Sequence, residues 1–238
     1  MNWYENRPIA HRGLHNNVDI PENSMAAFKA AIEADIPFEF DVHLTSDGEL
    51  VVLHDHNLER LTGVDADVES CTASFITSQK LMNTEENIPL LSDVLALVDG
   101  QVPILIEIKN EGKVGALEQK LLAVLDEYEG ELAIQSFNPL ALGFVAKNSP
   151  QIKRGQLSGS FKGENLPFYV KFILSNMILN IKSKPHFIAY EMTHLNKLSV
   201  KLHRLFKVPV LAWTLESKEE IALVKNSSDN IIFKFFRP

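Results

Sequence analysis

The chain has very little cysteine and no dense run of positively charged residues. Cys71 is the single cysteine among 238 residues, so no internal disulfide can form, and a lone cysteine is by default an inert small side chain. The formal net charge is −8, and Lys and Arg form no dense run, which disfavours a nucleic-acid-binding protein. The first 13 residues contain no apolar stretch of signal-peptide length, and we therefore expect a cytoplasmic protein.

Long hydrophobic runs are also lacking. The most apolar stretch, residues 166–181, is interrupted by Lys171, Ser175 and Asn176 and is too short to cross a bilayer. We expect a helix packed on a core there, with a membrane-contacting face as the alternative, and no stable membrane insertion. Two short motifs are missing as well. No G-x-G-x-x-G follows the first predicted strand, which disfavours a dinucleotide-binding sheet, and no G-x-S-x-G nucleophile elbow occurs.

Short β-rich runs alternate with helical patterns along the chain. Strands are predicted at 7–11, 38–45, 102–109, 131–137, 152–159, 186–191, 208–215 and 230–235, with an extra short strand at 49–55. Such alternation indicates βαβ units and a parallel sheet, and eight units in about 240 residues are typical of an α/β (β/α)8 TIM barrel. An open doubly wound sheet is the alternative. We expect one domain over 1–238, with 56–89 as an irregular excursion after the second strand.

The stretch FEFDVHLT, residues 38–45, alternates between apolar and ionisable side chains. Side chains two residues apart lie on the same face of a strand. One face therefore carries Glu39, Asp41 and His43, and the other is wholly apolar. An amphipathic strand with its polar face in water would show the same alternation, so the stretch alone does not decide between a solvated face and a site.

Ionisable and polar residues stand at the ends of most predicted strands, where parallel barrels carry their chemistry. These strand-end residues are His11 and Arg12, Glu39 and Asp41, His54 and Asp55, Glu107 and Lys109, Gln135 and Ser136, Tyr190 and Glu191, and Trp213 and Thr214. Burying the acids Glu39, Asp41 and Glu107 together requires neutralisation, because an unpaired buried charge is very costly. Oxygen ligands without cysteine predict a hard divalent cation, Ca²⁺ or Mg²⁺.

The basic strand-end residues suggest acid–base and phosphate chemistry. His11 and His54 are suited to general acid–base catalysis near neutral pH. Arg12 offers a planar fork that matches a phosphate. Lys109 offers a point charge for the same purpose, or forms an ion pair with Glu107 that holds this ligand in place.

Several motifs occur in a characteristic order: AHRG, PENSMAAFKAAIEA, FEFDVHLTSDGELVVLHDHNLERLTG, IEIKN, QSF and AWTL. In this order they resemble the glycerophosphodiester phosphodiesterase family, densely over residues 8–63 and sparsely to about residue 215. The resemblance implies a TIM barrel that cleaves glycerophosphodiesters into sn-glycerol 3-phosphate and an alcohol.

The resemblance also implies roles for individual residues. His11 and His54 would be the acid–base pair, Arg12 and Lys109 would hold phosphate, and the metal would be held by the acids Glu39, Asp41 and Glu107. Glu22 and Asn23 would support the site at its rim, or have no role beyond capping a helix at Ser24. Trp213, in AWTL, is a further supporting candidate.

The carboxyl-terminal end departs from the family pattern. Many relatives carry G-I-I-T-D-x-P near their last strand, whereas this chain has Phe233 and Lys234 where Thr and Asp would stand. No eighth helical pattern follows residue 235. We therefore expect a barrel with no clear eighth helix, and no role is carried over to the last strand.

Together these features predict a metal-dependent phosphodiesterase acting on a small glycerophosphodiester by His/His acid–base catalysis through a cyclic phosphate. The substrate's own hydroxyl would be the nucleophile, because the chain lacks a nucleophile elbow. Phospholipase C- or D-like cleavage of intact phospholipids and a non-catalytic glycerophosphate-binding barrel are the alternatives. The alcohol group, the choice between Ca²⁺ and Mg²⁺, the order in which the histidines act and the oligomeric state stay open.

Overall fold

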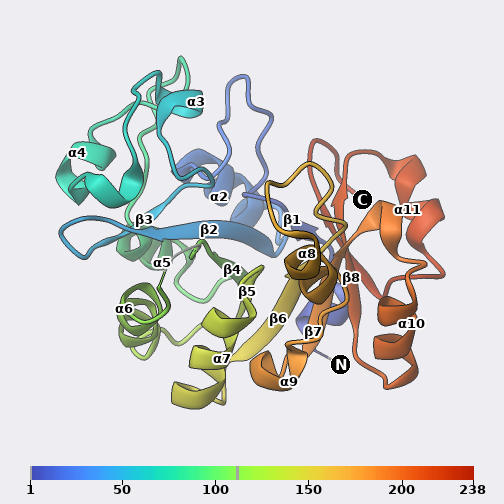
Figure 1. Cartoon of the computed structure of the whole chain (residues 1–238). Helices are drawn as coiled ribbons and strands as arrows, with labels where there is room; N and C mark the ends of the chain where they lie inside the picture. Colours follow the sequence, from blue (N-terminus) through green and yellow to red (C-terminus); the bar gives the residue numbers. More distant parts are fainter. Residues whose placement is uncertain (1, 111–112) are drawn as a thin grey trace.

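The computed structural model describes residues 2–110 and 113–238 and forms a closed parallel β-barrel (Figure 1). Its eight strands are β1 (Ile9–Ala10), β2 (Phe38–Leu44), β4 (Ile104–Ile108), β5 (Leu132–Ser136), β6 (Lys153–Ser158), β7 (Phe187–Glu191), β8 (Val210–Leu215) and β9 (Asn230–Phe233). Neighbouring strands in this order pair in parallel, and β1 pairs with both β2 and β9. The predicted TIM barrel is therefore confirmed, and the pairing of β1 excludes an open sheet.

Helices cover the outside of the barrel between successive strands. They are α2 (Met25–Glu33), α5 (Leu91–Val98), α6 (Ala116–Leu125), α7 (Pro139–Asn148), α8 (Phe168–Ser175), α9 (Asn180–Ser183), α10 (Leu198–Leu205) and α11 (Lys218–Val224). A short 3₁₀ turn, η2 (Met192–His194), follows β7. Residues 234–238, all of them described, form no helix after β9, as the sequence predicted.

The alternation of each strand separates two buried layers. On β4, Ile104, Ile106 and Ile108 pack with the outer helices, whereas Leu105 belongs to a second cluster inside the barrel. Trp3 and Tyr4 of α1 (Trp3–Asn6) join this inner cluster. The inner layer is apolar at the amino ends of the strands, and the polar site lies above it.

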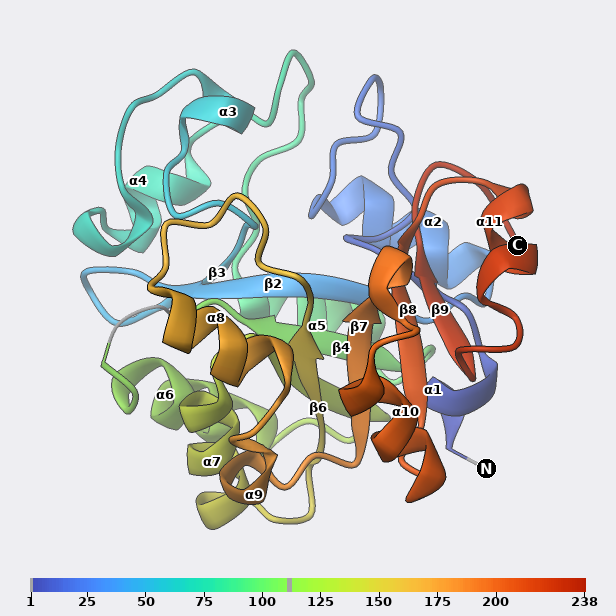
Figure 2. The same ribbon diagram turned by 45° about the vertical axis from the view of Figure 1, so that its right-hand side comes forward.

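Two pieces lie outside the regular barrel. Strand β3 (Leu50–Val52) pairs antiparallel with the second half of β2. The excursion 56–89 contains the short elements α3 (Glu59–Thr62), η1 (Val68–Ser70) and α4 (Ala73–Thr77). An apolar cluster of its own includes Leu58, Leu61 and Ile76. Figures 1 and 2 place α3 and α4 beside the carboxyl end of the barrel, so this segment can contribute to the site.

The expectation of one helix packed on the core at 166–181 is wrong. The segment forms two helices, α8 and α9, because α8 ends at Ser175 and Met177 adopts a left-handed conformation with φ of 54°. Only Ser175 and Met177 are buried among residues 166–181, and several large apolar side chains are exposed instead. Leu142 and Val145 of α7 and Val200 of α10 belong to the outer core cluster, whereas α8 (Phe168–Ser175) contributes no residue to it.

Candidate active site

Three buried carboxylates meet on the inner wall of the barrel. Glu39 and Asp41 project from β2 and Glu107 from β4, where Asp41 stands beside Glu107 in the strand register. One carboxylate oxygen from each lies within 4.8 Å of the other two, and all three residues are buried. Their apolar neighbours Phe38 and Phe40 point the other way, into the outer core. The two faces of residues 38–45 are thus a core face and a site face.

Two cations border this acid cluster. Lys109 Nζ lies 3.0 Å from Asp41 Oδ1 and 2.6 Å from Glu107 Oε1, while Arg12 Nε lies 3.6 Å from Asp41 Oδ2. Burial raises the pKa of Glu39 well above its usual value, and Asp41 and Glu107 add to this rise. Burial acts in the same direction on Asp41, but Lys109 and His54 outweigh it and hold the pKa of Asp41 below its usual range.

The acid cluster fits a hard divalent cation. Glu39 Oε2 accepts a hydrogen bond from the backbone N–H of Arg12 at 3.0 Å, but Glu39 Oε1 is buried without a hydrogen-bond partner. A buried oxygen of this kind is costly unless something binds it. Three oxygen donors with no thiolate among them suit Mg²⁺ or Ca²⁺.

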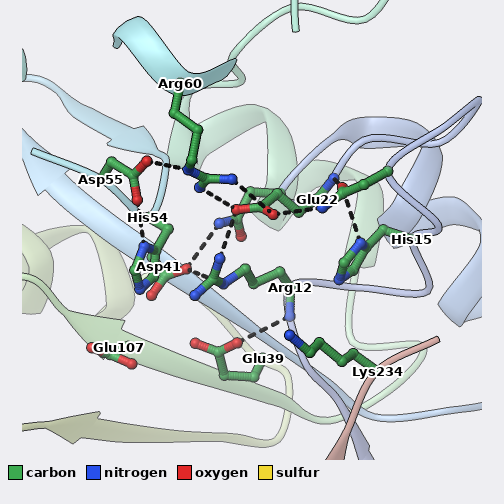
Figure 3. A network of polar contacts seen from close by, with 12 residues as sticks. Arg12, His15, Glu22, Glu39, Asp41, His54, Asp55, Arg60, Glu107 and Lys234 are labelled. Carbon is green, nitrogen blue, oxygen red and sulfur yellow. Dashed lines mark hydrogen bonds and ion pairs between the residues drawn. The ribbon is translucent and has the colours of Figure 1, made fainter. Parts of the chain in front are cut away.

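Arg12 is placed by an unusual backbone conformation directly after β1. Its φ is 56°, and Gly13 follows with φ of 80°. A Cβ at Gly13 would lie 2.8 Å from Cβ of Ala27 on α2, so only glycine allows this turn to pack so closely on the helix. The turn directs the Arg12 side chain over the acids, where Nη1 donates to Glu22 Oε1 at 2.7 Å (Figure 3).

The residues of the PENS motif reach the site as well as capping α2. Asn23 Nδ2 donates to Asp41 Oδ2 at 2.8 Å, and Ser24 Oγ accepts from the N–H of Ala27 at 3.1 Å. Glu22 is buried, and its carboxylate accepts hydrogen bonds from three side chains, Arg12, Arg60 and Asn17. Burial alone would raise the pKa of Glu22, but Arg60 and Arg12 lower it to about 2.

The two histidines stand at the same end of the barrel. His54 follows β3, and its Nδ1 lies 2.6 Å from Asp55 Oδ1. His11 follows β1, and its Nδ1 is buried without a hydrogen-bond partner. Burial lowers the pKa of His11 well below the usual value, Arg12 and His54 lower it further, and Asp41 opposes them. His43, for which the sequence suggested no role, is buried below His54, with Nε2 3.2 Å from the His54 carbonyl oxygen.

Two polar residues, Asp55 and Arg60, contact the site residues but received no role from the sequence. Arg60 of α3 donates to Asp55 and to Glu22 (Figure 3). This links His54 to Arg12 through Asp55, Arg60 and Glu22. The His-Asp dipeptide at 54–55 was a usable signal for Asp55, but nothing in the sequence near Arg60 points to Glu22, which is 38 residues away.

An aromatic group borders the site on the opposite side. Trp213 at the end of β8 packs edge-on against Phe137, with ring centroids 5.6 Å apart, and Phe137 meets Phe161 at 5.9 Å. Trp213 Nε1 is buried without a partner. Lys234, in the divergent carboxyl-terminal stretch, forms an ion pair with Glu216 at 2.9 Å.

Comparison with known proteins places this geometry in a family. The family model described as the glycerophosphoryl diester phosphodiesterase family matches residues 11–232. The chain belongs to the glycerophosphoryl diester phosphodiesterase family. Within the described residues, no helix is both long and apolar enough to cross a membrane.

Two relatives match this chain in sequence. A glycerophosphodiester phosphodiesterase of Caldanaerobacter subterraneus subsp. tengcongensis is 39% identical over 163 residues, which are 63% of this chain and 65% of the relative. A rat lysophospholipase D is 35% identical over 139 residues, which are 52% of this chain and 42% of the relative. The match thus spans less than two thirds of the length of these relatives.

The fold extends further than these sequence matches. A phosphodiesterase structure from Oleispira antarctica, in complex with the product sn-glycerol-3-phosphate, superposes with a TM-score of 0.79. It is 21% identical, and the superposition covers 95% of this chain and 92% of that one. At this identity the likeness establishes the shared fold.

Proposed function

We propose that this chain hydrolyses glycerophosphodiesters to sn-glycerol 3-phosphate and an alcohol. The observation that carries the proposal is the meeting of three buried acids with His11, His54 and Arg12 at one end of the barrel. Family membership supports it, as do relatives named glycerophosphodiester phosphodiesterase. The Oleispira antarctica structure, which holds the product sn-glycerol-3-phosphate in the same fold, is consistent with it.

Glu39, Asp41 and Glu107 would hold a Ca²⁺ or Mg²⁺ ion. When bound, such an ion lowers the pKa of a coordinated hydroxyl and polarises a phosphoryl oxygen. The unpartnered Glu39 Oε1 supports this assignment. Lys109, which lies between Asp41 and Glu107, fixes both carboxylates and leaves Glu39 as the acid without a side-chain cation within 4.0 Å among the described residues.

Arg12 and Lys109 would hold the phosphate of the substrate. Arg12 Nε is buried without a hydrogen-bond partner although Nη1 is bound to Glu22. The guanidinium is thus anchored by its hydrogen bond to Glu22, with Asp41 Oδ2 3.6 Å from Nε, and it keeps the Nε–H without a hydrogen bond, available to a phosphate oxygen. Anchoring of this kind is what bidentate recognition of an anion requires.

His11 and His54 would move the protons. In the first step one imidazole takes the proton from the glycerol hydroxyl next to the phosphorylated carbon, and this oxygen attacks phosphorus. The other imidazole protonates the leaving alcohol, which leaves a cyclic glycerol phosphate. Water then opens the ring with the two roles exchanged. Holding the attacking hydroxyl in the same molecule can lower the barrier by about 7–11 kcal/mol.

A second candidate function is lysophospholipase D activity. A rat relative bears that name, and the apolar side chains exposed on α8 lie directly after the loop that follows β6. The substrate would then be a lysophospholipid, which carries an acyl chain on its glycerol, and the same phosphodiester bond would be cleaved.

The test is a panel of glycerophosphodiesters and lysophospholipids, each assayed with Mg²⁺, with Ca²⁺ and with excess chelator. We expect equimolar glycerol 3-phosphate and alcohol from at least one glycerophosphodiester, and none with chelator. Preference for lysophospholipids would favour the second candidate. Absence of any product from the whole panel would overturn the proposal and favour a non-catalytic barrel that binds glycerophosphate.

A further inference from the structure

One side of the barrel exposes an unusual number of large apolar side chains. Among the residues that the structure describes, fifteen large hydrophobic side chains are exposed, and ten of these fall between residues 166 and 206. They are Leu166, Phe168, Tyr169, Phe172, Ile178, Ile181, Leu198, Leu202, Leu205 and Phe206. Figures 1 and 2 both show α8, α9 and α10, the helices that carry most of them, on the same side of the molecule. We call this the α8–α10 face.

The apolar side chains of this face follow helical spacing and point outward. On α10 and its end, Leu198, Leu202, Leu205 and Phe206 recur at intervals that place them on one side of a helix. Leu198, Leu205 and Phe206 are 71–77% exposed, while the side turned to the barrel buries Ser199 and Val200. The apolar stripe of α10 is therefore on the solvent side, the reverse of an ordinary barrel helix.

The stripe of α8 is arranged in the same way. Phe168 and Phe172 lie one turn apart, with ring centroids 6.5 Å apart, and Phe168 is 83% exposed. Helix α9 is joined to α10, because Asn180 Nδ2 lies 2.9 Å from His203 Nε2 of α10. Ile181, beside this contact, is 80% exposed. Exposed apolar side chains thus occur on all three helices of the face.

Positive charge is concentrated on the same segment. The chain as a whole has a formal charge of −8, yet residues 160–210 contain eight Lys and Arg residues against two acids, Glu164 and Glu191. The lysines of the face are Lys162, Lys171, Lys182, Lys184, Lys197, Lys201 and Lys207. In the described part of the chain, none of these seven forms an ion pair within 4.0 Å, whereas lysines 80, 109, 120 and 234 do.

We propose that the α8–α10 face docks on an anionic lipid bilayer. Aromatic and aliphatic side chains interleaved with lysines are the composition of helices that lie in the plane of a membrane interface. The apolar side chains would enter the interface, while the lysine stems extend along it and their ammonium groups reach anionic headgroups. Single exposed apolar side chains are ordinary, but ten large ones on and next to three neighbouring helices are typical of an interaction surface.

The positive charge of the α8–α10 face disfavours a second copy of this chain as its partner. A symmetric dimer would bring the face against itself, because the same patch is used on both subunits of such an interface. Seven unpaired lysines would then oppose seven others, which is costly. A negatively charged bilayer neutralises them instead.

The α8–α10 face lies next to the candidate active site along the chain. The proposed docking itself does not depend on catalytic activity. Phe168 and Tyr169 begin α8 directly after the loop 159–167, which leaves the carboxyl end of β6. Gly159 in this loop packs against Glu191 and Trp213, since a Cβ there would lie 3.0 Å from Glu191 Oε2. The segment that starts the docking face is thus the segment that borders the site.

The test is sedimentation of the full chain with two kinds of vesicle. One is phosphatidylcholine alone, and the other contains about 30 mol% phosphatidylglycerol, whose negative charge attracts basic segments. We expect binding to the anionic vesicles only, weakened in about 0.5 M salt, where charges are screened over a few ångströms. The double variants F168S/F172S and K182E/K201E should each bind at least about tenfold more weakly.

Matched controls are taken from outside the face. L140S/L223S removes two exposed leucines on α7 and α11, and K29E/K225E reverses two lysines of α2 and the end of α11. Both should bind like wild type. Failure of folded wild-type protein to bind anionic vesicles, or equal loss in the controls, would overturn the proposal. So would a concentration-dependent dimer in sedimentation equilibrium that F168S/F172S dissociates, since a second copy would then cover the face.

Discussion

Asp55 holds the imidazole of the residue that precedes it in the chain, with Oδ1 2.6 Å from Nδ1 of His54. An ionised carboxylate can only accept hydrogen bonds, so the proton of a neutral His54 lies on Nδ1, and Nε2 is the nitrogen free to accept another. Asp55 is itself fixed by Arg60, which also binds the buried Glu22. A residue of the excursion thus orients a proposed catalytic base.

This orientation predicts the effect of Asp55→Asn. The amide introduced at position 55 cannot form an ion pair with Arg60, so the imidazole of His54 is held less firmly. The amide can also donate to Nδ1, so the proton of a neutral His54 is no longer confined to Nδ1. We expect kcat for glycerophosphodiester hydrolysis to fall by about tenfold or more, as part of the roughly 10²–10⁴-fold that a general acid or base contributes, with little change in KM. ¹⁵N NMR of the imidazoles should report a mixed tautomer of His54. Asp65→Asn, which alters a carboxylate bound to Asn57 in the same excursion, is the control. Equal kcat in wild type and Asp55→Asn would remove this positioning role.

The guanidinium of Arg12 predicts that lysine is a poor replacement. An ammonium cannot bind Glu22 and a phosphate oxygen through separate, coplanar nitrogens. We expect Arg12→Lys to lose about 2 kcal/mol of transition-state stabilisation, or roughly 30-fold in kcat/KM. Arg7→Lys, at an exposed arginine paired with Asp35, should leave kcat/KM unchanged. Wild-type kinetics in Arg12→Lys would place the guanidinium outside the phosphate site.

The low pKa of Glu22 predicts how stability depends on pH. This pKa is about 2 in the folded protein and 4.5 for the ordinary group. The unfolded state therefore binds the proton first on acidification. The carboxylate contributes its full stabilisation above pH 4.5 and loses it as the pH falls towards 2.

The measurement is urea unfolding of Glu22→Gln and wild type across this pH range. Glu22→Gln should be less stable than wild type by roughly 3 kcal/mol near pH 7, and the difference should shrink between pH 4.5 and pH 2. A difference that stays constant with pH would mean that the charge of Glu22 is not what stabilises the fold.

The acid cluster predicts opposite effects of Glu39→Gln with and without metal. Without divalent ions the change removes a buried acid next to Asp41 and Glu107, so thermal stability should rise. With Ca²⁺ or Mg²⁺ at a hundredfold excess over Kd, wild type should gain about 2.7 kcal/mol, and Glu39→Gln should gain much less. Glu49→Gln, at a carboxylate paired with Lys120 outside the barrel, should respond like wild type. If wild type shows no metal-induced shift in Tm, the three acids are not a cation site.

The sequence was sufficient to predict the barrel and the end of it at which the candidate site residues lie. Parallel strands bring their carboxyl ends together, so His11, Glu39, Asp41 and Glu107 could be placed at one end from chain order alone. Contacts made by the loops could not be found this way. The bond from Arg60 to Glu22 depends on how the excursion folds over the barrel, and no periodic pattern encodes it. The outward apolar face of α10 was missed, and that of α8 was given only as the alternative for residues 166–181, because helical spacing identifies a stripe but not the side to which it turns.

The central claim is that this chain hydrolyses glycerophosphodiesters through His11 and His54 with a bound divalent ion. ³¹P NMR of glycerophosphocholine incubated with the purified chain and Ca²⁺ or Mg²⁺ tests it most directly, because diester, cyclic phosphate and monoester give separate signals. The account predicts conversion of the diester to glycerol 3-phosphate, with a transient cyclic phosphate, and no conversion with chelator or in His11→Ala and His54→Ala. It also predicts that an analogue without the 2-hydroxyl binds but is not cleaved. Normal turnover in excess chelator or in either histidine variant would contradict the account.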